Sequence, residues 1–411
     1  MEFFKTLTLP QVLSQFEVDD TASRIEEVPL LEGLGRIAAT DFYAQMDMPM
    51  FDRSTVDGYA IISKESLGAS ESIPSFFQLV GESKMGEEIT QVLKSGEAIY
   101  VPTGGMIPKG ADTMVMIEYT EKMDDTQLLI YKPSPPGADI SYRGDDLKTG
   151  DCIIKIGRKL DAYDIGMLSG AGYKNVKVFK RLKTAVISTG DEVKAVGEAL
   201  SFGQIYDVNG YTISSRLREL GCDVVYQALV KDDYQSLKDH VSKAIEMSDL
   251  VLLSGGSSVG TRDFTSKVIE SFDKSELITH GVAIKPGKPT IVGRIDKKYV
   301  IGLPGHPSSA LIIFNAIVQP LIYKYTNRTY KPFHIKATLL ENVHASPGKD
   351  TFQMVHLNFV DDEWFCKPIY AKSGMMSLLA NASGFIHITN EKEGLLKGAL
   401  VDVALLQEVR I

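Results

Sequence analysis

Cysteine is scarce in this sequence, and its few copies form no pattern. Cys152, Cys222 and Cys366 lie far apart in a chain of 411 residues, and no CxxC pair is present. This spacing excludes a zinc knuckle and a disulfide framework. An odd number of cysteines is also typical of proteins from a reducing compartment.

Long apolar runs are missing as well. The N-terminus shows no apolar stretch of the kind found in signal peptides. The most apolar span, residues 310–323, is too short to cross a membrane and contains Asn315, Gln319 and Pro320, so it predicts a buried helix. We therefore expect a cytoplasmic protein.

The sequence also lacks an excess of positive charge. Lys and Arg number 44 against 53 Asp and Glu, which gives a formal net charge of −9. This balance argues against general nucleic-acid binding, which usually requires a basic surface. It leaves open an anionic small substrate held by a local cluster of lysines. The hydrophobic content of 44% is that of a soluble globular protein, and the length predicts three or four domains.

The pattern of strands and helices divides the chain into three regions. Residues 1–180 show short β-type runs broken by Gly and Pro, and predict an N-terminal region of two lobes, one of them mainly β and inserted at about 45–140. In residues 181–328 strands alternate with amphipathic helices, which predicts a doubly wound α/β domain with a parallel sheet. Residues 329–411 give strand-like runs only, and predict a small β-barrel-like domain.

Polar stretches follow two of the strands expected in the α/β region. STGDE (188–192) follows the first strand, and SGGSSVGTRD (254–263) follows the third. Ligands of doubly wound sheets bind beyond the carboxyl ends of the strands. The sequence therefore predicts a site where these two stretches meet.

The glycine-rich stretch is compatible with three interpretations. Residues 256–260 match the G-x-S-x-G elbow of α/β-hydrolases, with Ser258 as nucleophile and His280 or His306 as a later triad histidine. A plain structural turn is the second interpretation. The third is a turn that opens a helix and leaves backbone N–H groups free to bind an anion. The stretch is not a Walker A motif, since no Gly-Lys-Ser/Thr follows. We favour the third interpretation, because the elbow pattern arises easily by chance and the stretch that comes next adds two lysines.

The next stretch supports anion binding. Residues 281–293 (GVAIKPGKPTIVG) place Lys285 and Lys288 in a loop with two prolines, of which Pro289 follows Lys288. The prolines stiffen the loop, so the two ammonium groups lose little freedom when they bind a phosphate or another oxyanion. A solvated loop with two surface lysines is the alternative.

Carboxylates form the other half of the predicted site: Asp191, Glu192, Asp207, Asp232, Asp233 and Asp263. No histidine or cysteine accompanies them at ligand spacing, which disfavours zinc and favours a hard cation such as Mg²⁺. An acidic cluster beside an anion site is understandable if a divalent cation bridges the two, because the carboxylates would otherwise repel the anion.

Some polar residues of the region are also suited to structural roles. Asp191 is suited to cap a turn, and one of Asp232 and Asp233 to cap a helix. In GLPGHPSSA (302–310), Ser308 and Ser309 are expected to cap the helix that follows.

With these motifs assembled, the sequence resembles the molybdenum insertase family, the MoeA-like molybdopterin molybdenumtransferases that include the gephyrin E domain. The resemblance covers essentially the whole chain. Its motifs are MPMFDRSTVDGYA (48–60), VPTGGMIPKGAD (101–112), ISYRGDDLKTGD (140–151), STGDEVKAVGEALSFGQIYDVNG (188–210), LLSGGSSVGTRDF (252–264), VAIKPGKP (282–289), GLPGHPSSA (302–310) and SGMMSLLANASG (373–384).

The resemblance implies an elongated homodimer of four-domain subunits. The α/β domain would bind the pterin, and the partner subunit's N-terminal lobe would complete the cleft. The implied reaction is hydrolysis of adenylylated molybdopterin with insertion of molybdate into the dithiolene and release of AMP, assisted by Mg²⁺. A molybdopterin adenylyltransferase is the implied pathway partner, and neither nucleic acid nor a membrane is involved.

The resemblance also implies roles for residues that match the family's motifs. Those implied in catalysis are Asp57, Thr103, Asp146, Glu192 and Asp263. Those implied in binding the substrate or its anionic groups are Asp207, Ser254, Gly255, Gly256, Ser257, Lys285, Lys288, Pro289, Pro304 and Ser309, with Ser373 near the molybdate. The expected Mg²⁺ ligands are Glu192, Asp232 and Asp263.

Several positions depart from the family's pattern: His306 stands where Asn is usual, Ser257 where Val is usual, Gly105 where Ala is usual, and Lys349 and Gln353 where arginines are common. A lysine offers a point charge where an arginine would offer a planar fork. The departures therefore bear on the oxyanion pocket and not on the overall function. The sequence does not distinguish molybdate from tungstate.

Two other functions remain open at this stage. One is a non-catalytic molybdopterin-binding scaffold, since the gephyrin relative also anchors membrane receptors. The other is a serine hydrolase that uses Ser258. The intact set of acidic residues favours the transferase over both.

Overall fold

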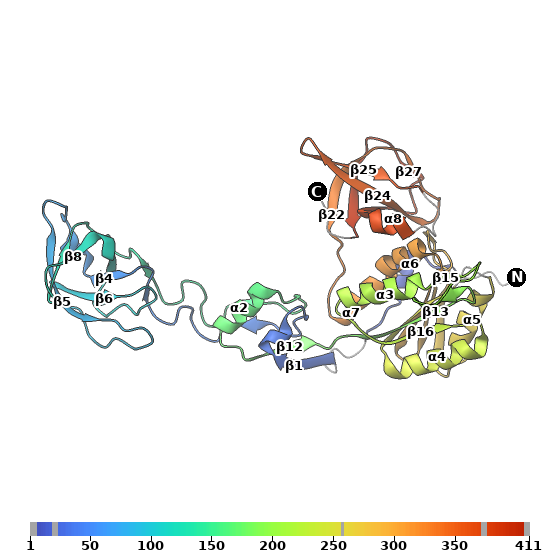
Figure 1. Ribbon diagram of the computed structural model, residues 1–411, viewed down its shortest axis with the longest axis horizontal. Coiled ribbons are helices and arrows are strands. Elements are labelled where there is room, and N and C mark those ends of the chain that lie inside the picture. Colours follow the sequence, from blue (N-terminus) through green and yellow to red (C-terminus); the bar gives the residue numbers. More distant parts are fainter. Residues whose placement is uncertain (1–5, 19–23, 256–258, 371–375, 407–411) are drawn as a thin grey trace. The chain divides into compact units, whose positions relative to one another are not determined.

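The computed structural model describes residues 6–18, 24–255, 259–370 and 376–406 (Figure 1). The chain divides into two compact units. One unit combines Met1–Glu26 with Phe179–Ile411, and the other is Glu27–Val178. The first unit contains the α/β and C-terminal regions, and the second contains β-rich N-terminal structure.

A six-stranded sheet forms the centre of the α/β region. Its strands follow the order β16-β13-β17-β21-β20-β18, and the first four are parallel, as the alternation of strands and helices predicts. β20 is antiparallel to both of its neighbours. Only Asp296 and Lys297 join it to β21, and a connection of that length permits a hairpin and no crossover. The strands are β13 (Lys183–Thr189), β16 (Asp223–Val230), β17 (Leu250–Ser254), β18 (Ser275–His280), β20 (Ile291–Ile295) and β21 (Lys298–Leu303).

Helices cover both faces of this sheet (Figure 1), which confirms the doubly wound prediction. Successive side chains of β13 point to opposite faces. Ala185 and Ile187 join the core under α4 and α5, whereas Val186 joins the core under α1, α3 and the α6–α7 segment. Because both faces are buried, the strands are apolar throughout and not alternating. The helices are α1 (Leu9–Ser14), α3 (Val208–Glu219), α4 (Tyr234–Met247), α5 (Val259–Glu270), α6 (Pro307–Ile313), the π-helical turn η5 (Phe314–Val318) and α7 (Gln319–Tyr325).

The segment α6–η5–α7 is one continuous helical run, and it confirms the buried helix expected at 310–323. Asn315 is buried within it, and its Nδ2 donates to Leu311 O at 2.8 Å, so the amide is satisfied inside the segment. Among the helices in the described part of the chain, none is long and apolar enough to cross a membrane.

The first helix belongs to the core of the α/β unit, although residues 1–180 are expected to form one N-terminal region. Val12 of α1 is fully buried in the same cluster as α6 and α7. Phe16 meets the ring of Tyr299 edge-on, with the ring centroids 5.0 Å apart. Tyr299 Oη also accepts a hydrogen bond from Glu17 N at 2.7 Å. These contacts attach the start of the chain to β21.

The C-terminal region is a closed five-stranded barrel, as predicted. Its strands follow the order β24-β25-β22-β28-β26, and β26 pairs back with β24. β19, which comes from the α/β region, adds to β24. The expectation of strands only is wrong at α8 (Met376–Asn381), because a helix of six residues is too short to show a clear period in the sequence. The strands are β19 (Ile284–Lys285), β22 (His334–Leu339), β23 (Val343–His344), β24 (Asp350–Val360), β25 (Glu363–Pro368), β26 (Gly384–Ile388), β27 (Gly394–Leu395) and β28 (Leu400–Leu405).

The second unit is rich in β-structure, as predicted. Its main sheet follows the order β7-β4-β6-β5-β9-β8, with Tyr59 and Val115 in the core on one face and Ile99 and Met114 in the core on the other. Three two-stranded pairs, β1-β12, β2-β11 and β3-β10, accompany it. The elements are β1 (Ile25–Pro29), η2 (Leu30–Gly33), β2 (Phe42–Tyr43), β3 (Arg53–Ser54), β4 (Gly58–Ile61), η3 (Ser63–Ser66), β5 (Ser75–Glu82), β6 (Glu97–Val101), β7 (Thr113–Met116), η4 (Ile117–Tyr119), β8 (Thr120–Lys122), β9 (Gln127–Ile130), β10 (Ile140–Ser141), β11 (Cys152–Ile154), α2 (Ala162–Gly170) and β12 (Asn175–Phe179).

Gly58 provides a test of how tightly this sheet is packed. A Cβ at Gly58 would lie 2.0 Å from Val115 O of β7. We expect Gly58→Ala to destabilise the unit by about 1–3 kcal/mol, the usual cost of overpacking, and to speed hydrogen–deuterium exchange in β4 and β7. Gly166→Ala in α2 is the control, because a Cβ there meets nothing within 4 Å. Unchanged exchange in β4 of the Gly58→Ala protein would contradict this packing.

Candidate functional site

A cavity of about 480 Å³ opens beyond the carboxyl ends of β13, β17 and β21, at the edge of the sheet where the sequence predicts a site. Ser188 and Thr189 reach it from β13, Ser254 and Gly255 from the end of β17, and Gly305 from the turn after β21. The start of α3 and the pair β14 (Val193–Lys194) and β15 (Ile205–Tyr206) form the rest of the wall. Three neighbouring strand ends therefore converge on one hollow.

Asn209 holds two of these strand ends together. Its side chain is buried, and Nδ2 donates to Ser254 Oγ and to Gly305 O, both at 2.8 Å. A buried amide with both partners in place fixes the spacing between the ends of β17 and β21. Nothing in the sequence points to this residue, because an uncharged amide near Asp207 gives no signal of its own.

Asp207 lines the cavity and also caps α3. Its Oδ1 accepts a hydrogen bond from Gly210 N at 2.8 Å, and its side chain is buried. A Cβ at Gly210 would lie 2.2 Å from Asp207 Oδ2 and 2.8 Å from Ser188 Oγ. Only glycine therefore lets the helix start approach the cavity wall this closely. The structure gives Asp207 a structural role in addition to its place in the wall.

Ser188 offers a buried hydroxyl to the cavity. Its side chain is 3% exposed, and Oγ has no hydrogen-bond partner among the residues that the structure describes. A buried polar atom without a partner is rare in native proteins and indicates a place for a bound molecule. In the sequence, the acids of STGDE indicate a site, whereas this serine hydroxyl gives no signal of its own.

Carboxylates gather beside the cavity at the ends of β13 and β16. Burial raises the pKa of Asp232 above its ordinary value, and the nearby charges of Asp191 and Glu192 raise it further. Asp232 N also donates to Asp191 Oδ1 at 3.3 Å, and Glu192 lines the cavity. The structure thus brings three of the predicted acids together, and a cation bound here would relieve their repulsion.

The residues that the structure describes do not form a complete metal site by themselves. Among the described residues, no group of three His, Cys, Asp or Glu is arranged to hold a metal ion. Mg²⁺ usually takes only one or two protein carboxylates and fills its shell with water and substrate phosphates. Glu192 and Asp232 fit that role. The side chain of Asp263, in α5, lies outside the described residues, so its part in the cluster stays a prediction.

The predicted helix caps have different outcomes. Asp233 is the N-cap of α4 and accepts a backbone N–H at 2.7 Å, which confirms one of the two alternatives. The expectation for Ser308 and Ser309 is wrong. α6 begins at Pro307 with His306 as N-cap and without a side-chain cap, because proline at the first helical position starts the helix before the serines.

The loop with Lys285 and Lys288 lies at the same edge of the sheet, since β18 runs parallel to β21 and the loop follows its carboxyl end. Neither lysine is among the residues that line the cavity, and both are exposed. Gly287 between them has a φ of 115°, and a Cβ there would lie 2.6 Å from Ile313 Cδ1. The loop therefore packs closely on α6, whose N-terminus borders the cavity.

The other predicted binding residues of this unit are scattered around the site. Pro304 and Ser309 are buried next to the cavity without lining it, and Pro289 is half-buried. Gly256, Ser257, Ser258 and Ser373 lie outside the described residues, so their roles stay predictions.

Three departures from the family pattern occupy distinct places. His306 lines the cavity. Gln353 Nε2 donates to Met354 O at 2.9 Å and to Ile369 O at 2.8 Å, so its amide group is engaged by the barrel's own backbone. Lys349 is half-buried in the turn before β24. Of the three, only His306 changes the wall of the cavity.

In the second unit the structure pairs two predicted residues. Thr103 donates to Asp57 Oδ1 through its backbone N at 2.7 Å and through Oγ1 at 3.1 Å. Both side chains are exposed, and they come from motifs some 45 residues apart, since Asp57 precedes β4 and Thr103 follows β6. The DGYA and TGG motifs therefore form one local structure.

Asp146 lies in an exposed turn that is fixed by its neighbours. Asp146 N donates to Met48 O at 2.9 Å. Asp47 accepts hydrogen bonds from the backbone and hydroxyl of Thr149 and from Arg143 Nε, and these contacts lower its pKa to about 2. The ionised carboxylate of Asp47 thus closes the turn that presents Asp146.

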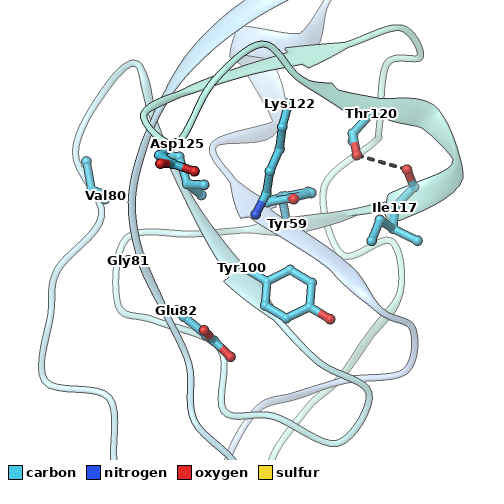
Figure 2. A pocket seen from close by; sticks show the side chains of 10 residues that line it. Tyr59, Val80, Gly81, Glu82, Tyr100, Ile117, Thr120, Lys122 and Asp125 are labelled. Carbon is cyan, nitrogen blue, oxygen red and sulfur yellow. Dashed lines mark hydrogen bonds between the residues drawn. The ribbon is translucent and has the colours of Figure 1, made fainter.

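A larger hollow of about 740 Å³ is lined by residues of β4, β5, β6 and β8 in the second unit (Figure 2). Tyr59 and Tyr100 line it, with ring centroids 5.6 Å apart, and Lys122 and Glu82 also belong to its wall, with the nitrogen of Lys122 drawn beside Tyr59. Thr120 Oγ1 donates to Ile117 O at 2.9 Å beside them. Size alone does not identify the site. The smaller cavity is preferred because a satisfied amide, an unsatisfied hydroxyl and clustered acids converge there.

Comparison with known proteins gives one consistent family. Family models match residues 7–172 (MoeA N-terminal region, domain I and II), 185–324 (probable molybdopterin binding domain) and 336–406 (MoeA C-terminal region, domain IV). The cavity lies within the second of these ranges.

Relatives match along most of the chain. The molybdopterin molybdenumtransferase of Haemophilus influenzae is 34% identical over 350 residues, 84% of this chain and 85% of the relative. That of Staphylococcus aureus strain COL is 33% identical over 383 residues, 92% of this chain and 91% of the relative. A crystal structure of the molybdopterin biosynthesis MoeA protein from Pyrococcus horikoshii is 38% identical with a TM-score of 0.84, and covers 98% of this chain and 100% of that one.

The acidic cluster predicts a pH-dependent stability. The pKa of Asp232 is raised above 3.8 in the folded protein, so folding is favoured by its protonated form, and this contribution is lost as the pH rises through the folded pKa. We expect Asp232→Asn to be more stable than the wild type at pH 7 in metal-free buffer. The difference should shrink as the pH falls toward 3.8.

Urea unfolding of both proteins between pH 4 and pH 7 measures this difference. Asp273→Asn is the control, because it makes the same chemical change at an exposed position. If the wild type were more stable than Asp232→Asn at pH 7, the raised pKa of Asp232 would not be what determines the contribution of the acidic cluster to stability.

Proposed function

Because the chain belongs to the MoeA family of molybdopterin molybdenumtransferases, we propose that it cleaves adenylylated molybdopterin and inserts molybdate into the dithiolene. Water breaks the phosphoanhydride between the pterin phosphate and the adenylate, and AMP leaves. Mg²⁺ assists. The cavity at the ends of β13, β17 and β21 is the observation that carries the proposal.

The cavity has the chemistry that a phosphorylated pterin needs. Its volume of about 480 Å³ is in the usual range for small-molecule sites. Ser188 Oγ is a donor for phosphate or pterin oxygens, and Gly255 lines the cavity beside it. Asn209 keeps Ser254 and Gly305 in fixed positions, so the donors need little rearrangement when the substrate binds.

The acidic cluster supplies the metal side of the proposed site. Glu192 and Asp232 would hold Mg²⁺, with Asp263 as a further ligand that the sequence predicts. When bound, the ion neutralises charge on the diphosphate and the leaving AMP. Carboxylates are weak bases at neutral pH, so these residues serve to position the ion and not to take a proton. Lys285 and Lys288 would hold the incoming oxyanion at the same edge of the sheet.

AMP release tests the proposed reaction. Purified protein is supplied with adenylylated molybdopterin, molybdate and Mg²⁺, and AMP is measured by chromatography. We expect Glu192→Gln and Asp263→Asn to lower the rate of AMP release by at least about tenfold, because a metal-positioning charge is lost. Glu270→Gln, an exposed position on α5, should keep the wild-type rate.

The same assay distinguishes the scaffold alternative. A wild-type protein that retains molybdopterin but releases no AMP would overturn the enzymatic proposal in favour of a binding protein. Undiminished AMP release from Glu192→Gln and Asp263→Asn would instead overturn the roles assigned to the two acids.

We also propose a homodimer in the cytoplasm, which receives its substrate from a molybdopterin adenylyltransferase. The resemblance supports a cleft in which Asp57 and Thr103 of one subunit serve the cavity of the other. Co-expression of Asp57→Asn with Glu192→Gln tests this. Mixed dimers hold one site without either substitution, so roughly a quarter of the wild-type activity should return for random pairing. Activity no higher than that of either variant alone would contradict a shared site.

A further inference from the structure

A second cleft lies at the opposite edge of the α/β sheet. Its volume is about 410 Å³, and it is formed by the residues before β13 and β17, the turn between β20 and β21, and the end of α7. These are the amino ends of the parallel strands. β13 has seven residues, so about 20 Å of strand separates this cleft from the cavity described above.

The lining of this cleft is strongly basic. Six of its ten lining residues are Lys or Arg: Arg24, Lys180, Arg181, Lys183, Lys297 and Lys298. The lining contains a single carboxylate, Asp249. The whole chain has a formal net charge of −9, so the positive charge of this cleft is opposite in sign to that of the protein as a whole. A cleft of one sign attracts ligands of the other sign and raises their local concentration.

The one carboxylate is already used by the backbone. Lys183 N donates to Asp249 Oδ2 at 3.0 Å, and Asp249 N donates to Lys183 O at 2.7 Å. Asp249 therefore joins the starts of β13 and β17. Arg181 Nη1 lies 3.7 Å from Asp223 Oδ1, and because both side chains are half-exposed this is a weak pair.

Arg24 is the residue that most clearly requires a ligand. Its guanidinium lies over the ring of Tyr325, 4.6 Å from the ring centroid, so the group is held in place. Its Nη1 is buried and has no hydrogen-bond partner among the residues that the structure describes. A buried, charged N–H group without an acceptor is costly, and a ligand oxygen would satisfy it.

From these observations we propose that this cleft binds a di- or triphosphate group, either as inorganic polyphosphate or as part of a nucleotide. The cations come from separate elements, since Lys183 lies on β13 and Lys298 on β21, the two strands that flank β17. That spread suits several phosphate groups in a row better than a single small anion. The site is separate from the proposed pterin site and independent of its chemistry.

A polyphosphate bound in this cleft would lie beside both segments of chain that connect the two compact units. Arg24 and Lys180 stand at the two places where the chain passes between its compact units, and Lys180 N donates to Arg24 O at 2.6 Å. A polyphosphate in the cleft contacts both chain passages together with the turn after β20.

Calorimetric titration with inorganic tripolyphosphate at low salt tests the proposal. Lys285→Ala/Lys288→Ala is the starting protein, so that binding at the proposed substrate site does not interfere. We expect binding of about one tripolyphosphate per chain, weakened at least about tenfold by adding Arg24→Gln and Lys183→Gln. Adding Lys336→Gln and Lys392→Gln is the matched control, because it removes two exposed lysines of the C-terminal barrel.

Each outcome decides the proposal. Arg24→Gln removes the packing of the guanidinium on Tyr325 and could lower binding through the fold alone. Lys183→Gln changes only an exposed side chain, and by itself it should still weaken tripolyphosphate binding. Tighter binding of ADP than of tripolyphosphate identifies a nucleotide, and the reverse order identifies an inorganic polyphosphate. Absence of binding to the starting protein, or equal loss in the cleft and control variants, overturns the site. AMP release from adenylylated molybdopterin should be unchanged when Arg24→Gln and Lys183→Gln are made in the wild-type protein, in which Lys285 and Lys288 are intact.

Discussion

The burial of β13, β17 and β21 on both faces is the constraint on which the rest of the structure depends. Alternate residues of each strand enter two separate cores, so the strands cannot slip by one residue without moving every side chain to the wrong core. Their carboxyl ends are therefore fixed in register, with Ser188 opposite Ser254 and Ser254 opposite Leu303. Polar residues at these ends meet at one edge of the sheet, and the cavity follows from this alignment.

Electrostatics explain why the two edges of the sheet differ. At the carboxyl edge, burial and then the neighbouring carboxylates raise the pKa of Asp232, and the clustered acids favour a cation between them and an anionic substrate. At the amino edge, Arg24 and Lys183 belong to a basic cleft with little compensating charge. Parallel strands with polar loops at both of their ends can thus carry an acidic site at one edge and a basic site at the other, without contact between the two.

The sequence indicated the architecture well and the detailed site less well. Strand–helix alternation predicted the doubly wound sheet, and strand-like runs predicted the barrel-like C-terminal domain. Polar stretches after two strands predicted the edge that holds the cavity. Asn209 escaped prediction because its importance comes from two hydrogen bonds between residues distant in sequence. Ser308 was expected to cap a helix that in fact starts at Pro307, since local preferences do not fix the first residue of a helix. The basic cleft also escaped, because its cations come from separate segments of an acidic chain.

The central claim is that the cavity beyond β13, β17 and β21 holds the pterin substrate. Hydrogen–deuterium exchange with and without molybdopterin tests it most directly. The claim predicts slower exchange in residues 188–193, 204–210 and 303–307, which line or border the cavity. Protection confined to the hollow around Tyr59 and Tyr100 in the second unit would contradict it.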